Sequence, residues 1–197
     1  MPKKRDTFFC LFVIILLGIT SCREIPVPKP RGYFRIDLPE KEYVKYDTTC
    51  PFVFEYPAYS KISYNTGANN AEPCWFNIEF PDYNAIIYIT YKEINNNFEA
   101  IMEDSYKLDV KNHTIKADAI NETPLENSDE SVYGMLYDLK GNTASSVQFY
   151  LTDSLKNYIR GSLYFSVEPN KDSLAPVINF FREDILHLIE TFKWKEN

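Results

Sequence analysis

Alternating hydrophobic and polar positions predict β-strands through the middle of the chain. The residues at 52–56 and 76–80 alternate in this way, so each segment is expected to form a strand with one buried face. The turn residues Pro81-Asp82-Tyr83-Asn84 connect the second segment to a returning strand at 85–91, which makes a hairpin. Four more strands are predicted at 113–120, 133–139, 145–151 and 158–165. Short polar connections between the last three indicate an antiparallel meander.

Two segments have the spacing of amphipathic helices. Between 97 and 109, apolar side chains recur at helical spacing after a run of three asparagines that can cap the helix. Near the C-terminus, Asp172 or Ser173 can cap a helix that has Pro176 in its first turn. Its apolar side chains fall on one stripe at about 100° per residue: Leu174, Val177, Ile178, Phe181, Ile185, Leu188, Ile189 and Phe192. Because this stripe must pack on a sheet, the predicted fold is an α+β sandwich in which helices cover an antiparallel sheet.

The first 22 residues have the layout of a bacterial lipoprotein signal. Basic residues at 3–5 precede a twelve-residue apolar run at 8–19, which is shorter than the ~18 residues of a membrane-spanning helix. Small residues at 20 and 21 then precede Cys22. We therefore predict a signal peptide at 1–21, diacylglycerol on the Cys22 thiol and acylation of the new amine. The alternative is an ordinary secretory signal in which Cys22 is incidental, and it too would export the chain.

Residues 22–48 are expected to form the lipid anchor and a proline-rich tether, and residues 49–197 a single α+β domain. Prolines at 26, 28 and 30 favour extended polyproline II structure in the tether. Two or three acyl chains would hold the protein durably, because one chain binds a membrane only marginally. The residues after Cys22 contain neither an aspartate at the second position nor an acidic cluster. We therefore expect a periplasm-facing anchor, in the outer membrane in preference to the inner membrane.

Two of the four cysteines remain in the mature domain. Cys10 leaves with the signal and Cys22 carries lipid, so Cys50 and Cys74 form a candidate disulfide in an oxidising periplasm. The chain-entropy estimate for a loop of this size is about 3.5 kcal/mol of stabilisation. The alternative is that Cys50 and Cys74 are two buried free thiols.

Composition and charge narrow the classes of function. The chain has a net charge of −7, and removal of the signal, which carries three basic residues and Asp6, would make the charge −9. A domain this acidic is not expected to bind nucleic acid. Fifteen Tyr and fourteen Phe can supply a large core, and exposed Tyr side chains can form a recognition surface.

The sequence contains no motif that predicts an enzyme or a metal site. The chain contains no Gly-x-Ser-x-Gly, Walker or dinucleotide-binding pattern. His113 follows the first helix, where it either faces a cleft or lies in a loop or at a strand edge, and His187 projects from the polar face of the last helix. The adjacent carboxylates Glu103-Asp104 and Glu183-Asp184 point about 100° apart and are interpreted as solvated. With two histidines and no Cys-x-x-Cys spacing, zinc is not expected, and no catalytic residue or cofactor is predicted.

Several blocks of residues are shared, in order, with one known family. After Cys22 they are Pro-Lys-Pro (28–30), Gly-Tyr-Phe-Arg-Ile-Asp-Leu-Pro (32–39), Cys-Pro-Phe-x-Phe-Glu-Tyr-Pro (50–57), Cys-Trp-Phe-Asn-Ile (74–78), Tyr-Gly-Met-Leu-Tyr-Asp (133–138) with Gly-Asn (141–142), Gln-Phe-Tyr-Leu-Thr-Asp (148–153), Arg-Gly-Ser-Leu-Tyr-Phe (160–165) and Asp-Ser-Leu-x-Pro-Val-Ile (172–178). Together these blocks resemble the GldD family of gliding-motility lipoproteins in Bacteroidetes. The resemblance implies a non-enzymatic envelope component needed for gliding and for the type IX secretion machinery. The order of strands and helices is also similar to that of PsbP/Mog1-type α/β/α sandwiches. Only Cys22 carries over as a functional residue.

Three classes of function follow from these observations. The first is a lipid-tethered interaction module, whose partners are the membrane, through the N-terminal lipid, and other gliding and secretion proteins of the envelope. The second is a periplasmic small-molecule or lipid binder with a pocket between sheet and helices. The least favoured is a cell-envelope hydrolase. A tyrosine-rich exposed surface would support the first, a closed apolar cavity the second, and a deep cleft joining His113 to a carboxylate the third.

Overall fold

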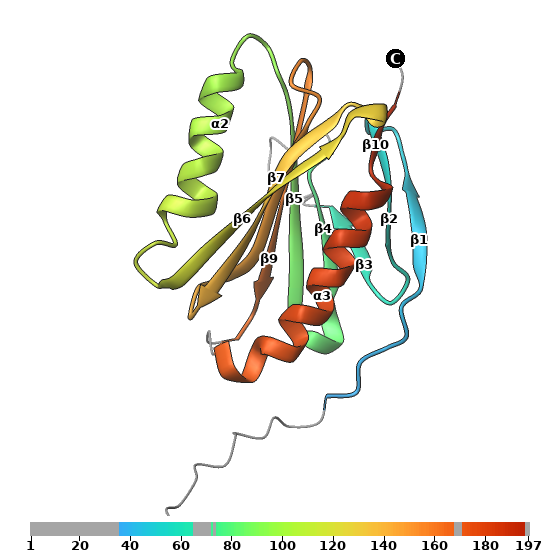
Figure 1. Cartoon of the computed structure of the whole chain (residues 1–197). Helices are drawn as coiled ribbons and strands as arrows, with labels where there is room; N and C mark the ends of the chain where they lie inside the picture. Colours follow the sequence, from blue (N-terminus) through green and yellow to red (C-terminus); the bar gives the residue numbers. More distant parts are fainter. Residues whose placement is uncertain (1–35, 65–71, 73, 168–170, 196–197) are drawn as a thin grey trace, which may run out of the picture. The chain divides into compact units, whose positions relative to one another are not determined.

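The structure of the protein is a computed structural model that describes residues 36–64, 72, 74–167 and 171–195. Residues 36–197 form one compact unit. Its elements are β1 (Tyr43–Asp47), β2 (Phe52–Pro57), β3 (Lys61–Tyr64), β4 (Phe76–Phe80), the 3-10 turn η1 (Pro81–Tyr83), β5 (Ala85–Glu93), α2 (Phe98–Tyr106), the π-helical turn η2 (Lys107–Lys111), β6 (Ala117–Asn127), the 3-10 turn η3 (Ser128–Glu130), β7 (Val132–Gly141), β8 (Ser145–Thr152), β9 (Asn157–Phe165), α3 (Lys171–Thr191) and β10 (Lys193–Trp194). This mixed content, with helices packed on antiparallel sheets (Figure 1), confirms the predicted α+β fold class.

Seven strands form one large antiparallel sheet, in the order β3-β4-β5-β9-β8-β7-β6. The hairpin predicted from the alternating pattern is β4 with β5, where Ile78 lies opposite Ile87. Ile87 also lies opposite Leu163 of β9, so buried side chains form a row across the sheet. The predicted meander is β7, β8 and β9. A second, smaller sheet has the order β1-β2-β10.

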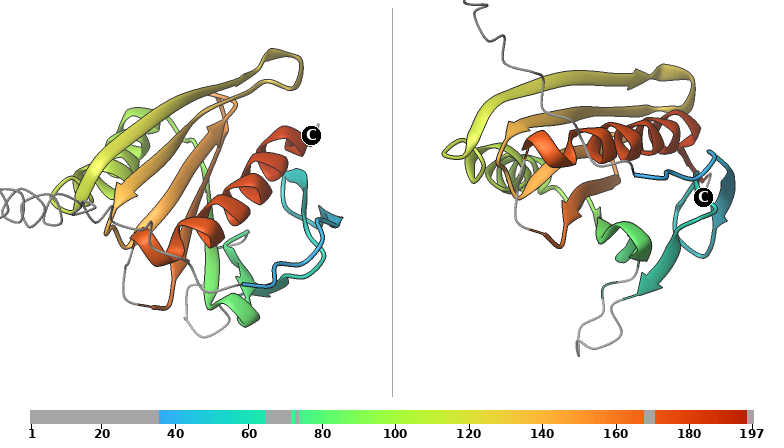
Figure 2. Two further views of the ribbon diagram at one scale, coloured as in Figure 1. Left: turned by 60° about the horizontal axis from the view of Figure 1, so that its bottom comes forward. Right: turned by 90° about the horizontal axis from the view of Figure 1, so that it is seen from below.

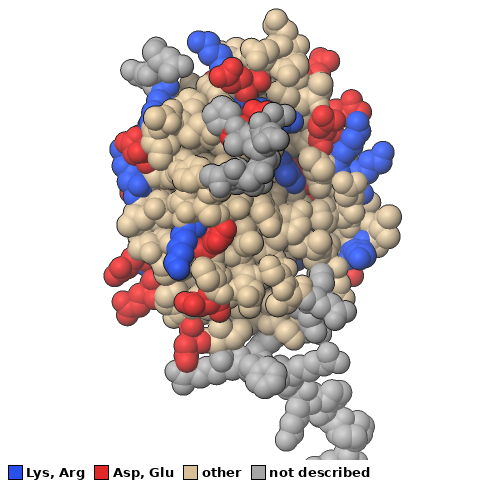
Figure 3. All heavy atoms as spheres, turned by 180° about the vertical axis from the view of Figure 1, so that it is seen from behind, with Lys and Arg blue, Asp and Glu red and all other residues tan. Residues whose placement is uncertain are grey.

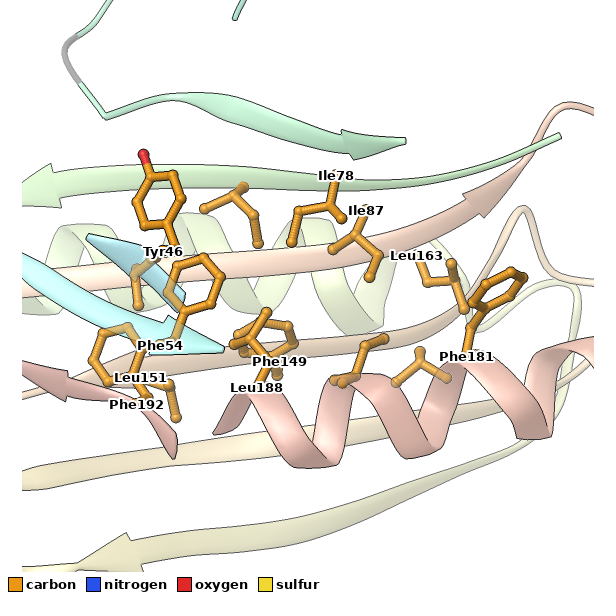
Figure 4. Close-up of a cluster of buried hydrophobic side chains, with 14 of the residues drawn as sticks. Tyr46, Phe54, Ile78, Ile87, Phe149, Leu151, Leu163, Phe181, Leu188 and Phe192 are labelled. Atoms are coloured by element: carbon orange, nitrogen blue, oxygen red, sulfur yellow. The ribbon is translucent and has the colours of Figure 1, made fainter. Parts of the chain in front are cut away.

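The main core lies between the large sheet on one side and α3 with the small sheet on the other. Phe181 and Leu188 of α3, together with Phe192 just after the helix, face the large sheet, which contributes Phe149 and Leu151 to the same cluster (Figure 4). All five side chains are buried. Burial of each such side chain stabilises the fold by about 1.5–3 kcal/mol, so the apolar stripe predicted from the sequence is what holds α3 in place.

α2 covers the opposite face of the large sheet (Figure 2). A smaller apolar cluster lies on this face and consists of Val110 from η2 with Tyr137 and Leu139 from β7. The sheet is therefore covered on both faces, which gives a three-layer arrangement. The helix predicted at 97–109 corresponds to α2 and its continuation into the π-helical turn η2.

Some strands differ from those that the sequence predicts. β1, β3 and β10 are additional, and most of β1 is exposed, so its sequence lacks the alternation that identifies a half-buried strand. The strand predicted at 113–120 is shifted: residues 113–116 form turns, and β6 occupies Ala117–Asn127. No residue of β6 is fully buried, so residues 121–127 lack the hydrophobic alternation that predicts a strand.

The folded domain begins before residue 49, where the sequence placed its start. β1 pairs with β2 from Tyr43, opposite Pro57, to Asp47, opposite Val53. These residues therefore belong to the domain and not to the tether. The tether predicted at 22–48 is shortened accordingly at its C-terminal end, and residues 22–35 lie outside the described part of the chain.

Candidate functional site

The segment that leads from the tether into β1 is fastened to α3 by one buried carboxylate. The Oδ1 atom of Asp184 accepts from Lys41 Nζ at 2.6 Å and from the Tyr43 hydroxyl at 3.0 Å. Its Oδ2 atom accepts from the Tyr59 hydroxyl at 2.5 Å. The side chain of Asp184 is fully buried, whereas that of Lys41 is 26% exposed. We call Lys41, Tyr43, Tyr59 and Asp184 the Asp184 clamp.

Neighbouring groups on α3 hold the same segment. Lys41 Nζ donates to the carbonyl oxygen of Phe180 at 2.7 Å and lies 3.4 Å from the centre of the Phe180 ring, a cation–π contact. The ring of Tyr43 stacks on His187 with 3.6 Å between centroids. Burial and the Asp184 carboxylate raise the pKa of Tyr43 and of Tyr59, so both hydroxyls remain protonated donors. The clamp therefore fixes the point where the tether meets the domain.

A second buried polar group joins η2 to the large sheet. Asp109 is completely buried, and its carboxylate receives a hydrogen bond from Ser105 at 2.8 Å and another from the Nε of Arg160 on β9. Gln148 of β8 receives a hydrogen bond from Arg160 at 2.6 Å and donates to the backbone carbonyl of Asp109 at 3.3 Å. Tyr158 donates to the Ser105 hydroxyl. We call these five residues the Asp109 network. The hydrogen-bonding groups of these residues pair with one another. A buried pair of opposite charges is stable only when its remaining donors and acceptors are paired in this way.

His113 lies beside the Asp109 network but does not complete a catalytic arrangement. Its side chain is buried, and this burial lowers the pKa of the imidazole against the opposing effect of the Asp109 carboxylate, so the ring is neutral at neutral pH. The Ser105 hydroxyl donates to Asp109 and accepts from Tyr158. Within the described residues, no hydrogen bond joins Ser105 to His113, so these two side chains do not form a serine–histidine pair.

Cys50 and Cys74 are joined in the structure. Their Cα atoms are 5.6 Å apart, within the usual range for a disulfide. The bond connects the loop between β1 and β2 with the residues just before β4, and thus links the small sheet to the large one. Cys74 lines an open cleft of about 560 Å³ together with Tyr91, Glu93 and Lys156. Burial raises the pKa of Tyr91 to about 12, and its hydroxyl donates to Asn157 at 2.7 Å.

Replacement of Cys50 and Cys74 by alanine is expected to lower the free energy of unfolding by about 3.5 kcal/mol, because the unfolded chain loses a cross-link across 24 residues. The measurement is urea unfolding in a Cys22→Ala background, with and without reductant. Reductant should lower the midpoint of the parent protein and leave the double variant unchanged. An unchanged midpoint of the parent in reductant would show that the two thiols are not bonded in solution.

Two other clefts lie near the ends of the hairpins. One of about 510 Å³ lies between the β6–β7 turn and the end of α3, and one of about 550 Å³ lies beside β10. All three clefts are open to solvent and mix polar with apolar lining, and none is lined by Asp109 or His113. Among the described residues, no group of three or more His, Cys, Asp or Glu side chains is arranged to hold a metal ion. Within that part of the chain, no helix combines the length and apolar composition that crossing a membrane requires.

The tyrosines divide between packing and exposure. Tyr46, Tyr137 and Tyr158 are buried in the sheets, whereas Tyr64 and Tyr88 are exposed. Figure 3 shows one face of the molecule on which a broad uncharged band lies between groups of charged side chains. Tyr106 and Tyr133 are exposed as well, so part of the described tyrosine content is used in sheet packing and part is available for recognition.

The sequence pattern indicates some of these residues but not the central ones, Asp184 and Asp109. Cys22 lies outside the described residues, and Cys50 and Cys74 are brought together. The interpretation of Glu183-Asp184 as solvated is wrong for Asp184, which is buried, although Glu183 is exposed. His187 is not free on a polar face, because it contacts both Tyr43 and Glu55.

A signal for the Asp109 network was present but weak. Ser105 and Asp109 are four residues apart and so lie on one helix face, the same face as the apolar positions of α2. On β8 and β9, Gln148 and Arg160 are polar residues at positions where alternation directs the side chain toward η2. Polar residues on faces that should be buried indicate a network, but they do not identify which residues pair.

Comparisons with known proteins place the chain in a family. The family described as "Gliding motility lipoprotein GldD" matches residues 23–194. No match is found among curated proteins. Among solved structures, the solution structure of cyanobacterial PsbP (CyanoP) from Synechocystis sp. PCC 6803 is similar, with 13% identity and a TM-score of 0.47 over 90% of this chain and 99% of that chain. Because the family match extends over nearly the whole chain, this protein belongs to the gliding motility lipoprotein GldD family, a family of lipid-anchored proteins of the cell envelope.

Proposed function

We propose that this chain is a non-enzymatic, periplasm-facing component of the gliding and type IX secretion machinery, which acts by assembling or stabilising other envelope proteins. The observation that carries the proposal is the family match over residues 23–194. The Asp184 clamp supports it, because a domain that is held rigidly at its junction with the lipid tether is suited to presenting a fixed surface to partners.

The hydrogen bonding and burial of Asp109 and His113 support the non-enzymatic part of the proposal. Asp109, the most buried carboxylate near a histidine, already interacts with Ser105 and Arg160. A catalytic acid or base needs access to substrate, and none of the three clefts reaches His113 or Asp109. The polar groups of this region are therefore assigned to holding η2 on the sheet.

Side chains fill the space between the large sheet and α3, and this close packing favours a partner surface over a ligand pocket. The layer between the large sheet and α3, where a lipid or small molecule would bind, is packed with aromatic side chains: the ring centroids of Phe80 and Phe181 are 4.3 Å apart. Ligand sites are usually enclosed and mostly apolar, whereas the three clefts described above are open and mix polar with apolar lining.

The outer membrane is the proposed location of the lipid. The residues after Cys22 contain no aspartate at the second position, and the prolines at 26, 28 and 30 favour an extended spacer between membrane and domain. Separation of the two membranes by density, followed by immunodetection, tests this location. Recovery of the protein with the inner membrane would contradict it.

The functional proposal is tested by deleting the gene and restoring it with wild type, Cys22→Ala or Cys10→Ala. We expect deletion to abolish gliding and release of the motility adhesins, and Cys22→Ala to restore neither fully because the protein is no longer anchored. Cys10→Ala is the matched control, since Cys10 lies in the predicted signal and carries no lipid, and it should restore both activities. Normal gliding and secretion in the deletion strain would contradict the proposal, and full activity of unlipidated Cys22→Ala would contradict the role of the anchor.

A further inference from the structure

The longest described strand of the domain lies at one end of the large sheet. β6 is eleven residues long, and among the described strands it pairs with β7 alone (Figure 2). In an antiparallel strand, every second residue directs its N–H and C=O groups away from the paired neighbour. Only Ala117, Ile120 and Leu125 are even half-buried, and the other residues of β6 are exposed. Along this side, β6 therefore carries a row of backbone donors and acceptors that no other described strand uses.

The charge along this edge has one sign. Glu122 and Glu126 lie on β6, and Asp129 and Glu130 follow in the turn η3. No Lys or Arg occurs between Lys116 and Lys140. The edge thus combines two features: backbone groups that no described strand pairs, and a negative potential, which attracts positively charged chains and repels acidic ones.

Pairing of β6 with a second copy of itself is disfavoured. Two such edges would bring carboxylates together across the new ladder, and like charges that lie opposite one another destabilise a sheet. Pro124 lacks a backbone donor, and the ladder with β7 is irregular between Ala117 and Ala119. Exposed edges in natural proteins commonly carry charge, proline and bulges, which prevent self-association. The carboxylates do not oppose a partner strand of positive charge, whereas Pro124 removes one donor from the edge for any partner.

A cleft next to the edge is suited to a basic side chain. The cleft of about 510 Å³ has Leu125 of β6, Val132 of β7 and Ile189 of α3 among its apolar residues. Its polar lining includes Glu126 and Glu190. A lysine or arginine of an added strand could pack its aliphatic stem on the apolar residues and place its charge near the carboxylates.

We propose that β6 binds an extended, positively charged segment of another envelope protein, which adds to the large sheet as an eighth strand and inserts a Lys or Arg side chain into the cleft beside Leu125 and Glu126. Strand addition of this kind gains affinity from backbone hydrogen bonds and specificity from alternate side chains. The inference rests on the proposed function, because it names the surface and the class of partner through which an assembly module would act.

Synthetic peptides test the chemistry of the edge directly. The full chain in detergent is titrated with labelled ten-residue peptides. One peptide alternates Lys and Val, and a second alternates Glu and Val. Two further peptides have the Lys/Val sequence, with the backbone N-methylated at every Val in one and at every Lys in the other. We expect the Lys/Val peptide to bind and to slow hydrogen exchange of β6 amides, and the Glu/Val peptide to bind at least tenfold more weakly. Only one set of alternate amides in an added strand faces β6, so only one N-methylated form should lose binding.

Charge reversal gives a matched pair of variants. Glu122→Lys/Glu126→Lys should weaken binding of the Lys/Val peptide at least tenfold and strengthen binding of the Glu/Val peptide. Asp82→Lys/Glu99→Lys is the control, because it makes the same change in net charge at exposed residues of η1 and α2 and should leave both affinities unchanged. In cells, the first variant should impair gliding at a normal protein level, and the control should glide normally.

Four results would overturn the proposal. They are equal binding of acidic and basic peptides, protection of β3 instead of β6, a photo-crosslink from position 123 to a second copy of the chain, and a photo-crosslink from position 123 to residues 23–35 of the same chain. If deletion abolishes gliding but the β6 variant binds peptide and glides normally, the edge proposal fails while the proposed function stands. If deletion has no effect on gliding, the proposed function itself fails.

Discussion

Asp184→Ala is expected to lower the free energy of unfolding by about 3–5 kcal/mol, because it removes one partner of a buried ion pair and leaves Lys41 without its carboxylate. The hydroxyls of Tyr43 and Tyr59 lose the same acceptor. For a domain of this size the midpoint of thermal unfolding should fall by about 10 °C. Thermal and urea unfolding in a Cys22→Ala background measure the change. Trypsin should also cleave after Lys41 more rapidly in the folded variant.

Glu183→Ala is the matched control for this substitution. Glu183 is next to Asp184, is 69% exposed and lies 3.8 Å from Lys41. Its removal should change the free energy of unfolding by less than about 0.5 kcal/mol, as for most surface substitutions. Lys41→Met should recover part of the stability in the Asp184→Ala background, since it removes the unpaired charge. Equal losses in Asp184→Ala and Glu183→Ala would show that the clamp does not form in solution.

Asp109→Leu is expected to lower the free energy of unfolding by a similar amount, about 3–5 kcal/mol, because it leaves the largely buried guanidinium of Arg160 without its carboxylate. Combining it with Arg160→Met should recover more than half of this loss, since an apolar pair can replace a buried ion pair at little cost. Urea unfolding of the two single variants and the double variant measures the coupling between the two positions.

Lys107→Ala serves as the control in the same helical segment. Lys107 pairs with Glu103 at 2.8 Å on an exposed face, so its midpoint of unfolding should be indistinguishable from that of the parent. The Asp109→Leu/Arg160→Met protein also separates stability from function. We expect it to support gliding once it is folded. A folded double variant that does not support gliding would give the Asp109 network a direct functional role and would contradict the structural role assigned to it above.

Elements with a strong periodic pattern could be predicted from the sequence. The β4–β5 hairpin was identified because Phe76, Ile78 and Phe80 alternate with polar residues and a turn sequence follows. α3 was identified because its apolar residues recur every three or four positions, and the same residues are buried in the core. In both cases the burial of one face determines the pattern of the sequence directly.

The elements of the candidate site could not be predicted, because they depend on contacts between distant residues. Lys41 and Asp184 are 143 positions apart, and neither has a neighbour in sequence that indicates the other. Glu183 and Asp184 are adjacent acidic residues that the sequence alone does not distinguish. Glu183 is exposed and Asp184 is buried, because successive residues of a helix point in different directions. β6 was underestimated because an exposed edge strand has little hydrophobic alternation.

The position of the Asp184 clamp along the chain has a mechanical consequence. Lys41 precedes the first paired residue of β1, so a pull on the N-terminal end of the chain reaches the clamp before it reaches the backbone ladder between β1 and β2. The load then passes through Asp184 into α3, whose buried face spreads it over the core. A moving envelope would therefore strain this ion pair and the helix before the ladder between β1 and β2, and these strands would separate only after the clamp had opened.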